Sequence, residues 1–187
     1  MPTDLSAIDG PTHGGLPTAA LTELVCPSPS CGSHLLLGQL LAATRQRGQR
    51  VALVDPSHTF DPASHPASDL EHLIWARDCD TPTALTVTDL LARDANLHLV
   101  ILDLTAAPAH ALRRIPASLW YRLQRAVETT ALALLVFSPR ALVPSAQLRL
   151  QLTKTHHLTA LDQDRPDLLP LLTPTLTRQR QSHALSA

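Results

Sequence analysis

The residues with the clearest chemical potential form a short turn after an apolar stretch near the N-terminus. The turn, Cys26-Pro27-Ser28-Pro29-Ser30-Cys31-Gly32-Ser33-His34, follows Leu21-Thr22-Glu23-Leu24-Val25 and precedes Leu35-Leu36-Leu37. A strand, a turn of small residues and a helix in this order present backbone N–H groups and a helix N-terminus to an anion. The pattern therefore indicates the kind of turn that binds phosphate groups.

The turn departs from the phosphate-binding pattern G-x-x-x-x-G-K-[ST] at the positions that bind nucleotide. Pro27 stands for the first glycine, Ser33 replaces the lysine and His34 replaces the hydroxyl residue, while Gly32 remains. The missing lysine would meet the β and γ phosphates, and His34 offers nitrogen where Mg²⁺ prefers oxygen. We therefore expect no nucleotide cofactor and no catalysis. The remnant of the site is predicted to comprise Pro27, Ser30, Gly32, Ser33, His34, Ser57 and Asp103.

Two other sites at this turn are weaker hypotheses. Cys26, Cys31 and His34 have a C-x₄-C-x₂-H spacing that could supply three zinc ligands, with Cys79 or His58 as a fourth. Buried thiols that pack as small apolar groups are the favoured interpretation, and no metal site is predicted. A hydrolase triad of Ser33, His34 and Asp103 is rejected, because adjacent residues at a helix start point apart.

Composition limits the class of protein. The chain has 187 residues, 44% of them hydrophobic, and a formal net charge of −1, which gives no general attraction to nucleic acid or to an anionic membrane. Charges or prolines interrupt every apolar run before it reaches spanning length, and the N-terminus lacks a signal-peptide pattern. Three cysteines, an odd number, are typical of free thiols in a reducing compartment. We expect a cytoplasmic protein without a membrane partner.

The elements expected to position the turn alternate along the chain. Apolar runs predict strands at 22–25, 50–55, 73–76, 97–102 and 131–137, and helical spacing predicts helices at 33–45, 83–93 and 117–129. This alternation predicts an α/β fold, with a mainly parallel twisted sheet, helices on both faces, and an antiparallel edge strand near the C-terminus, at 148–152. The expected divisions are an extended arm at 1–18, the domain at 19–153 and a poorly ordered Pro/Thr/Arg-rich tail at 154–187.

The strand ends of this fold predict where the site residues meet. In parallel sheets the working crevice lies beyond the carboxyl ends of the strands. Asp55 and Asp103 each end an apolar run, as the turn at 26–34 does. We therefore expect the turn and both carboxylates at one edge of the sheet.

Five segments in order resemble the RecA recombinase family. They are Gly-Gly-Leu-Pro at 14–17, the strand and turn at 22–34, the stretch at 54–62, the Walker B-like strand Leu99-Val100-Ile101-Leu102-Asp103-Leu104, and Leu134-Leu135-Val136-Phe137. The resemblance implies a RecA-like P-loop core. Ser57 stands where the family has its catalytic glutamate, and Ser138-Pro139-Arg140 where a glutamine senses the γ-phosphate. By the same resemblance, the nucleotide site is degenerate.

A narrower resemblance is to ImuA-type proteins, RecA-like accessory proteins of bacterial translesion mutagenesis that are related in fold to the division inhibitor SulA. It is carried by Gly-Gly-Leu-Pro at 14–17 with Leu-Thr-Glu-Leu at 21–24, by Val-Ala-Leu-Val-Asp at 51–55, and by Arg-Arg-Ile-Pro-Ala-Ser-Leu-Trp-Tyr-Arg-Leu-Gln-Arg-Ala-Val-Glu at 113–128. It implies a non-catalytic adaptor in the SOS response to DNA damage. The implied partners are an ImuB-like Y-family polymerase homologue, an error-prone DNA polymerase and RecA, with weak DNA contact and oligomerisation as further options. The alternatives are a SulA-like inhibitor that binds FtsZ and a weak ATPase completed in trans by a partner.

The predicted helix at 117–129 carries the candidate partner surface. Leu119, Leu123, Ala126 and Val127 form its expected inward stripe. Aromatic residues and arginine are enriched at interface hot spots, although a helix face with charges is most often simply solvated. The partner-binding candidates are Trp120, Tyr121, Arg122 and Arg125 on this helix, with Arg178 and Arg180 in the tail.

Overall fold

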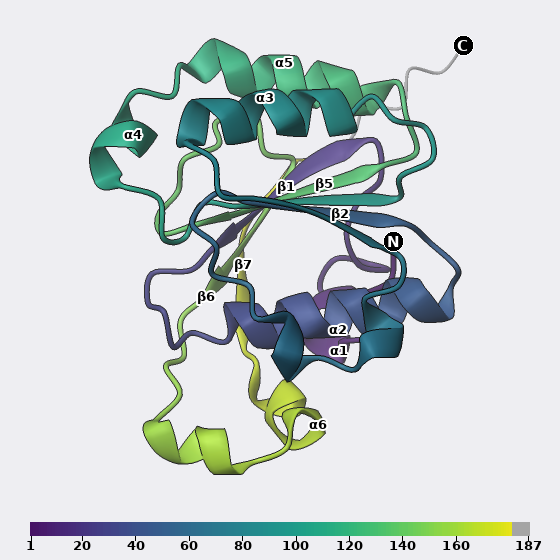
Figure 1. The fold of residues 1–187 in the computed structure, drawn as a ribbon, viewed down its shortest axis with the longest axis vertical. Coiled ribbons are helices and arrows are strands. Elements are labelled where there is room, and N and C mark those ends of the chain that lie inside the picture. Colours follow the sequence, from purple (N-terminus) through teal and green to yellow (C-terminus); the bar gives the residue numbers. More distant parts are fainter. Residues whose placement is uncertain (181–187) are drawn as a thin grey trace.

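A seven-stranded sheet lies between two layers of helices (Figure 1). The computed structural model describes residues 1–180, except the side chain of Leu161. The strand order is β3-β2-β4-β5-β1-β6-β7. The strands are β1 (Ala20–Val25), β2 (Val51–Asp55), β3 (Leu73–Arg77), β4 (Leu99–Asp103), β5 (Ala133–Ser138), β6 (Leu148–Leu152) and β7 (Pro174–Gln179). The helices are α1 (Ser6–Asp9), α2 (Ser33–Gln46), α3 (Thr81–Leu91), α4 (Ala109–Arg113), α5 (Ala117–Glu128) and α6 (Arg165–Leu168).

The central strands are buried on both faces, as their continuous apolar sequences predict. Every residue of β1, β2, β4 and β5 is buried, and all strand pairs except β6–β7 are parallel. One face packs against α2 and α1, and the other against α3 and α5 (Figure 1). The predicted α/β architecture with a mainly parallel sheet is therefore confirmed.

The C-terminal edge of the sheet differs from the prediction in one respect. The strand at 148–152, β6, pairs parallel with β1 and antiparallel with β7. The antiparallel edge strand is therefore β7, whose Pro, Thr and Gln residues were assigned to the tail. Because β7 lies at the edge, alternate side chains face water, and its sequence has no apolar run that would mark it as a strand.

The segment at 1–18 is not an extended arm. It contains α1, and Leu5, Ile8 and Leu16 are buried in the core cluster on the α2 side of the sheet. The Asp9 carboxylate accepts hydrogen bonds from the backbone N–H groups of Thr3 and Asp4. Three apolar side chains and this local hydrogen bonding fix a segment in which we find no helical periodicity.

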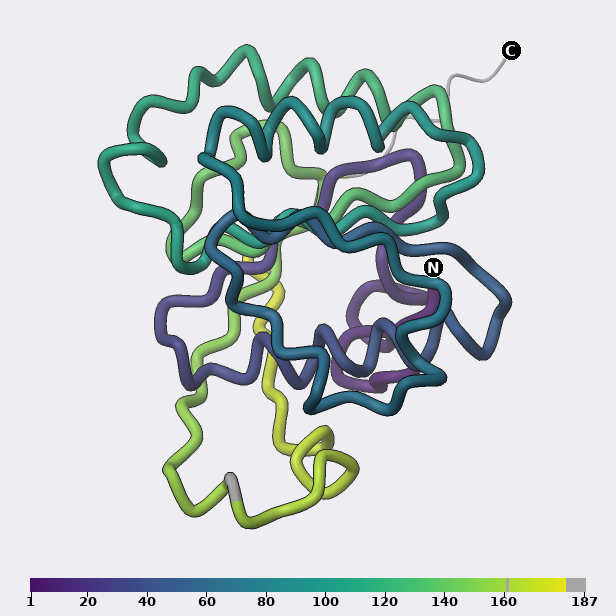
Figure 2. The backbone as a smooth tube through the Cα atoms, viewed as in Figure 1, coloured from purple at the N-terminus to yellow at the C-terminus, as the bar shows by residue number. Residues whose placement is uncertain are grey.

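The segment after 153 is likewise structured as far as residue 180. It leaves the sheet after β6, forms 3₁₀ turns and α6 beside α2, and returns as β7 (Figure 2). Leu168 and Leu172 are buried, and Arg165 donates a hydrogen bond to the hydroxyl of Ser64 at 2.9 Å. The prediction of a poorly ordered tail is wrong for 154–180, and its remainder, 181–187, lies outside the described residues.

The loop between β5 and β6 is anchored by a buried ion pair. Glu23 on β1 is fully buried and accepts hydrogen bonds from Arg149 Nε at 2.5 Å and from Ser138 Oγ at 2.9 Å. The same carboxylate accepts from the backbone N–H groups of Leu142 and Val143. Because a buried charge must be paired, this network sets the position of the loop that follows the carboxyl end of β5.

Across residues 1–180, we find no helix with the length and apolar character needed to cross a membrane.

Candidate functional site

The turn at 26–32, Asp55 and Asp103 meet at the carboxyl edge of the sheet, where β1, β2 and β4 end. A cavity of about 380 Å³ lies there, and its walls come from the turn, the start of α2, and the loops after β2, β4 and β5. Its lining includes Pro27, Ser33 and His34. A hydroxyl links the two carboxylates, because Thr59 Oγ1 lies 3.2 Å from Asp55 Oδ1 and 3.4 Å from Asp103 Oδ2. The three features that the sequence assigns to one edge are thus adjacent.

The turn is held by backbone and serine hydrogen bonds. The N–H of Cys26 donates to the carbonyl of Ser138 at 2.7 Å, and the N–H of Cys31 donates to the carbonyl of Ser28 at 3.1 Å. The hydroxyls of Ser28 and Ser30 are 3.1 Å apart. The side chain of Ser30 is therefore engaged within the turn itself.

Gly32 makes the sharp entry into α2. Its φ of +88° is in the left-handed region, which favours glycine because it lacks a Cβ. Among residues 1–180 no side chain caps this helix, so the first N–H groups of α2 depend on the turn, solvent or a ligand. Ser33 is buried, whereas the His34 side chain is 39% exposed. The N-terminus of this fourteen-residue helix therefore presents backbone N–H groups that could bind an anion beside the cavity. The chain has Ser33 where the phosphate-binding pattern has a lysine.

The two carboxylates are largely occupied by protein donors. Asp55 accepts from the backbone N–H groups of Thr59 and Phe60, at 3.0 and 2.9 Å. Asp103 Oδ1 accepts from the N–H of Thr105 at 2.9 Å and from its hydroxyl at 2.6 Å. These contacts hold the loops that follow β2 and β4, and they leave few free lone pairs for a metal-bound water.

Burial gives Asp103 unusual acid–base behaviour. Its side chain is 3% exposed, and this burial raises the pKa of the carboxyl, while the hydrogen bonds from Thr105 oppose the shift. His34 Nε2 lies 4.0 Å from Asp103 Oδ2. His34 therefore occupies the space next to Asp103, where its imidazole would carry a charge only when protonated.

Cys26 and Cys31 are two buried neighbouring thiols. The interaction with Cys31 and burial raise the pKa of Cys26, while the interaction with Cys26 lowers the pKa of Cys31 to about 6. Both side chains belong to the core cluster next to α2. Within the described part of the chain, no group of three or more His, Cys, Asp or Glu side chains could hold a metal ion.

The segment after β6 covers the outer side of the turn, a contact absent from the sequence analysis. The N–H of His156 donates to the carbonyl of Ser30 at 2.9 Å. A Cβ added to Gly32 would lie 2.5 Å from Leu172 Cδ2 and 3.2 Å from His156 Nε2. The glycine is therefore required both by its backbone conformation and by this close cover. The i, i+4 spacing of Leu168 and Leu172 was the available sequence signal for a packed segment.

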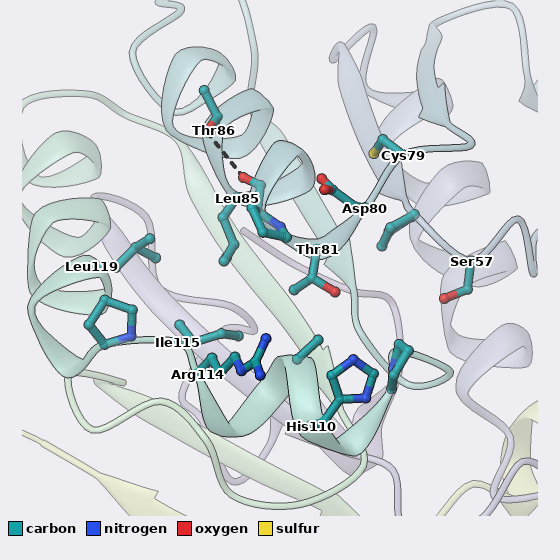
Figure 3. A pocket seen from close by; sticks show the side chains of 15 residues that line it. Ser57, Cys79, Asp80, Thr81, Leu85, Thr86, His110, Arg114, Ile115 and Leu119 are labelled. Carbon is teal, nitrogen blue, oxygen red and sulfur yellow. Dashed lines mark hydrogen bonds between the residues drawn. The ribbon is translucent and has the colours of Figure 1, made fainter.

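Ser57 does not line the cavity at the turn. It follows β2 and is exposed, and it lines a separate and larger cavity between the start of α3 and the α4–α5 connection (Figure 3). That cavity measures about 700 Å³. No motif singled it out, because its walls come from three separate stretches of sequence, at 56–57, 79–86 and 108–119.

The partner candidates on α5 divide between core and surface. Trp120 is 2% exposed and packs in the core cluster with Leu123 and Val127, so its assignment to a partner surface is wrong. The i, i+3, i+7 spacing of these three residues is the sequence signal that Trp120 lies on the buried face of the helix. Tyr121 is 48% exposed, and Arg122 Nε lies 3.5 Å from Oδ1 of Asp89 on α3.

The remaining arginines lie on two elements. Arg125 is exposed on α5. Arg178 is half-buried on β7 opposite Arg149, and the N–H of the exposed Arg180 donates to the carbonyl of Gln147. Arg178 and Arg180 therefore belong to the C-terminal edge strand and its end, and not to the α5 surface.

Comparisons with known proteins agree with this architecture. No protein-family model matches the chain. The chain is 33% identical over 110 residues to the protein RecA of Streptomyces avermitilis, and this match covers 57% of the chain and 29% of that protein. It is 32% identical over 107 residues to the protein RecA of Synechocystis, covering 56% of the chain and 30% of that protein. The matches thus span less than a third of the length of these relatives.

A solved structure extends the similarity over most of the chain. The crystal structure of the RadB recombinase superposes with a TM-score of 0.63 and 19% identity, and the match covers 80% of this chain and 81% of that one. Together with the strand order, this establishes a RecA-like fold.

Proposed function

We propose that this chain is a RecA-like adaptor that binds partner proteins without hydrolysing nucleotide. The observation that carries the proposal is the state of the turn at the carboxyl edge. The helix N-terminus remains, but Ser33 and His34 occupy the lysine and hydroxyl positions, and Asp103 is hydrogen-bonded to Thr105. Phosphoryl transfer depends on positioned charge, and a site without its cation lacks the principal means of stabilising the transferred group.

The narrower role we propose is that of an ImuA-type accessory protein in DNA-damage-induced translesion synthesis. Its partners would be an ImuB-like Y-family polymerase homologue, an error-prone DNA polymerase and RecA. The RecA-like fold is consistent with such a role, and the sequence likenesses at 51–55 and 113–125 support this branch. A cytoplasmic location follows from the same proposal.

The outward face of α3 and α5 is the partner surface we favour. It combines Leu90, which is 71% exposed, with Tyr121, Arg122 and Arg125. The two helices lie side by side over one face of the sheet (Figure 1), and the Arg122–Asp89 contact joins them. Exposed tyrosine with adjacent arginine is typical of interface hot spots, and the exposed leucine adds apolar area beside them.

Nucleotide titration tests the non-catalytic part of the proposal. We expect neither Mg²⁺-dependent binding of a fluorescent ATP analogue nor phosphate release by the purified chain. Tight Mg²⁺-dependent binding, or steady phosphate release that is lost in Asp103→Asn, would contradict it. The uncapped N-terminus of α2 favours a weak ATPase completed in trans as the second candidate, and repeating the assay with the partner present separates the two.

Charge reversal tests the partner surface. Arg122→Glu combined with Arg125→Glu should weaken capture by an immobilised ImuB-like protein at least about tenfold, because hot-spot arginines contribute on the order of 2 kcal/mol. Arg50→Glu with Lys154→Glu makes the same change in net charge at exposed residues on other elements and should leave capture unchanged. Equal capture of both variants would assign the α5 arginines to a solvated face. Selective capture by FtsZ would instead favour the division inhibitor.

A further inference from the structure

A cavity of about 700 Å³ lies away from the turn and from the outward face of α3 and α5. It opens between the first turns of α3, helix α4 and the start of α5 (Figure 3). Its volume is within the range of small-molecule sites in proteins. The adaptor proposal does not use it, and of the residues assigned to the remnant of the nucleotide site Ser57 alone lines it.

One wall of this cavity is apolar and rigid. Leu85, Ile115 and Leu119 line it from α3 and from the start of α5 (Figure 3). Four prolines also line the cavity: Pro56, Pro82, Pro108 and Pro116. Proline fixes its own φ and has no N–H, so these walls are preformed and offer few backbone donors. The wall is suited to an apolar group that needs no hydrogen bonds.

The opposite side of the cavity presents the hydrogen-bonding side chains of Thr81, His110 and Arg114. Thr81, in the first turn of α3, lines this side of the cavity, and the residue as a whole is 6% exposed. In Figure 3 this hydroxyl points toward the side of the cavity formed by α4. A hydroxyl that faces the cavity can donate a hydrogen bond to a ligand oxygen.

Arg114 supplies a positive charge beside this hydroxyl. Its guanidinium lies along the same side of the cavity as the His110 imidazole (Figure 3), and no acidic side chain pairs with it within residues 1–180. Asp80 also lines the cavity, but its carboxylate accepts the N–H of Thr83 at 2.8 Å as the cap of α3. The Asp80 carboxylate keeps its negative charge but is engaged by the N-terminus of α3, and Arg114 is the cation of the lining.

From these observations we infer that the cavity is a binding site for a small apolar molecule with a carboxylate group. The apolar body would pack on Leu85, Ile115 and Leu119, and the carboxylate would accept hydrogen bonds from Arg114 and from the Thr81 hydroxyl. Arginine suits this role because its planar N–H groups match a carboxylate. The inference does not depend on the proposed adaptor function.

A matched series of probes tests the site. The probes are 4-phenylbutanoate, 4-phenylbutanamide and 4-phenylbutylamine, which share one apolar body and differ in the polar group. Ligand-observed NMR and ¹H–¹⁵N spectra of the full chain should show the acid binding with a dissociation constant of about 1 mM or tighter. The acid should bind about tenfold more tightly than the amide, as expected for a hydrogen bond to a charged group, and the amine should not bind. Shifted amide signals should map to 79–86 and 108–119.

Two variants and one control assign the contacts. Arg114→Gln and Thr81→Val should each weaken binding of the acid about three- to tenfold and reduce its preference over the amide. Arg113→Gln removes a neighbouring exposed arginine that does not line the cavity and should leave binding unchanged. No binding of the acid at millimolar concentration, equal binding of acid and amide, or equal loss in the Arg113→Gln control would each overturn the inference. Because Arg114 is exposed and unpaired in the described chain, Arg114→Gln should retain the wild-type melting temperature, which circular dichroism verifies.

Discussion

Arg149→Met tests whether the buried carboxylate of Glu23 organises the edge of the sheet on which the candidate turn lies. Glu23 is fully buried, and it accepts hydrogen bonds from Arg149, Ser138 and two backbone N–H groups. Removal of Arg149 leaves a charge in the core without its counter-ion. Breaking a buried pair in this way costs about 3–5 kcal/mol, and the lower end applies because the Arg149 side chain is 19% exposed.

The reverse substitution should cost less, because the two partners differ in burial. Glu23→Gln preserves the shape of the side chain, and the partly exposed guanidinium of Arg149 keeps its 2.8 Å bond to the carbonyl of Val143. We expect about 1–2 kcal/mol for this variant. In the double variant, Arg149→Met should add only about 1 kcal/mol, since no buried charge is left unpaired.

Urea denaturation followed by circular dichroism measures these free energies of unfolding. A loss of about 3 kcal/mol should also lower the melting temperature by roughly 6–12 °C in a chain of this length. Arg93→Met is the matched control, because Arg93 is 55% exposed and its pair with Asp89 should contribute under about 1 kcal/mol. If Arg149→Met costs no more than this control, the pair does not anchor the edge and the reasoning is refuted.

Two further predictions concern the packing of the segment after β6 and the pH dependence of the stability of the whole chain. Leu172→Ala should lower the free energy of unfolding by about 2–3 kcal/mol and make 153–180 sensitive to limited proteolysis. Leu171→Ala, at a site that is 40% exposed, should have neither effect. Equal protease sensitivity of the two variants would mean that the segment does not pack on the turn. Burial and the neighbouring Arg165 lower the pKa of His65 to about 4, so the unfolded chain binds more protons between pH 6.5 and 4. The contribution of His65 to the free energy of unfolding is therefore complete above about pH 6.5 and is lost as the pH falls toward 4. We expect a loss of about 1 kcal/mol, because solvent screens a partly exposed group. A His65→Asn variant that loses the same stability in acid would contradict this prediction.

The core of the fold was predictable because its signals are local. The apolar runs ending at Val25, Asp55 and Asp103 are buried on both faces, so every residue of each strand carries the same pattern. The convergence of the turn with the two aspartates follows from parallel pairing alone. The helix at 33–45 was predictable from its leucine spacing and corresponds to α2.

The exposed and peripheral elements were less predictable, because their environment sets their structure. β7 has alternating exposure and is a strand only because β6 offers it an edge. α1 has four residues, too few for a periodic signal, and depends on the burial of Leu5 and Ile8. Trp120 was misassigned because one residue along a helix turns a side chain by about 100°, from the surface into the core.

By itself, the amino-acid sequence determined the alternation of the central strands and helices, the parallel sheet, and the residue types at the turn, since residue types and local periodicity are properties of the chain. Only the tertiary structure decided which carboxylate oxygens are occupied, that His156 and Leu172 cover Gly32, and that Thr81 and Arg114 face one cavity. These are contacts between segments distant in sequence. Their geometry depends on how the helices pack on the sheet, and no local pattern encodes it.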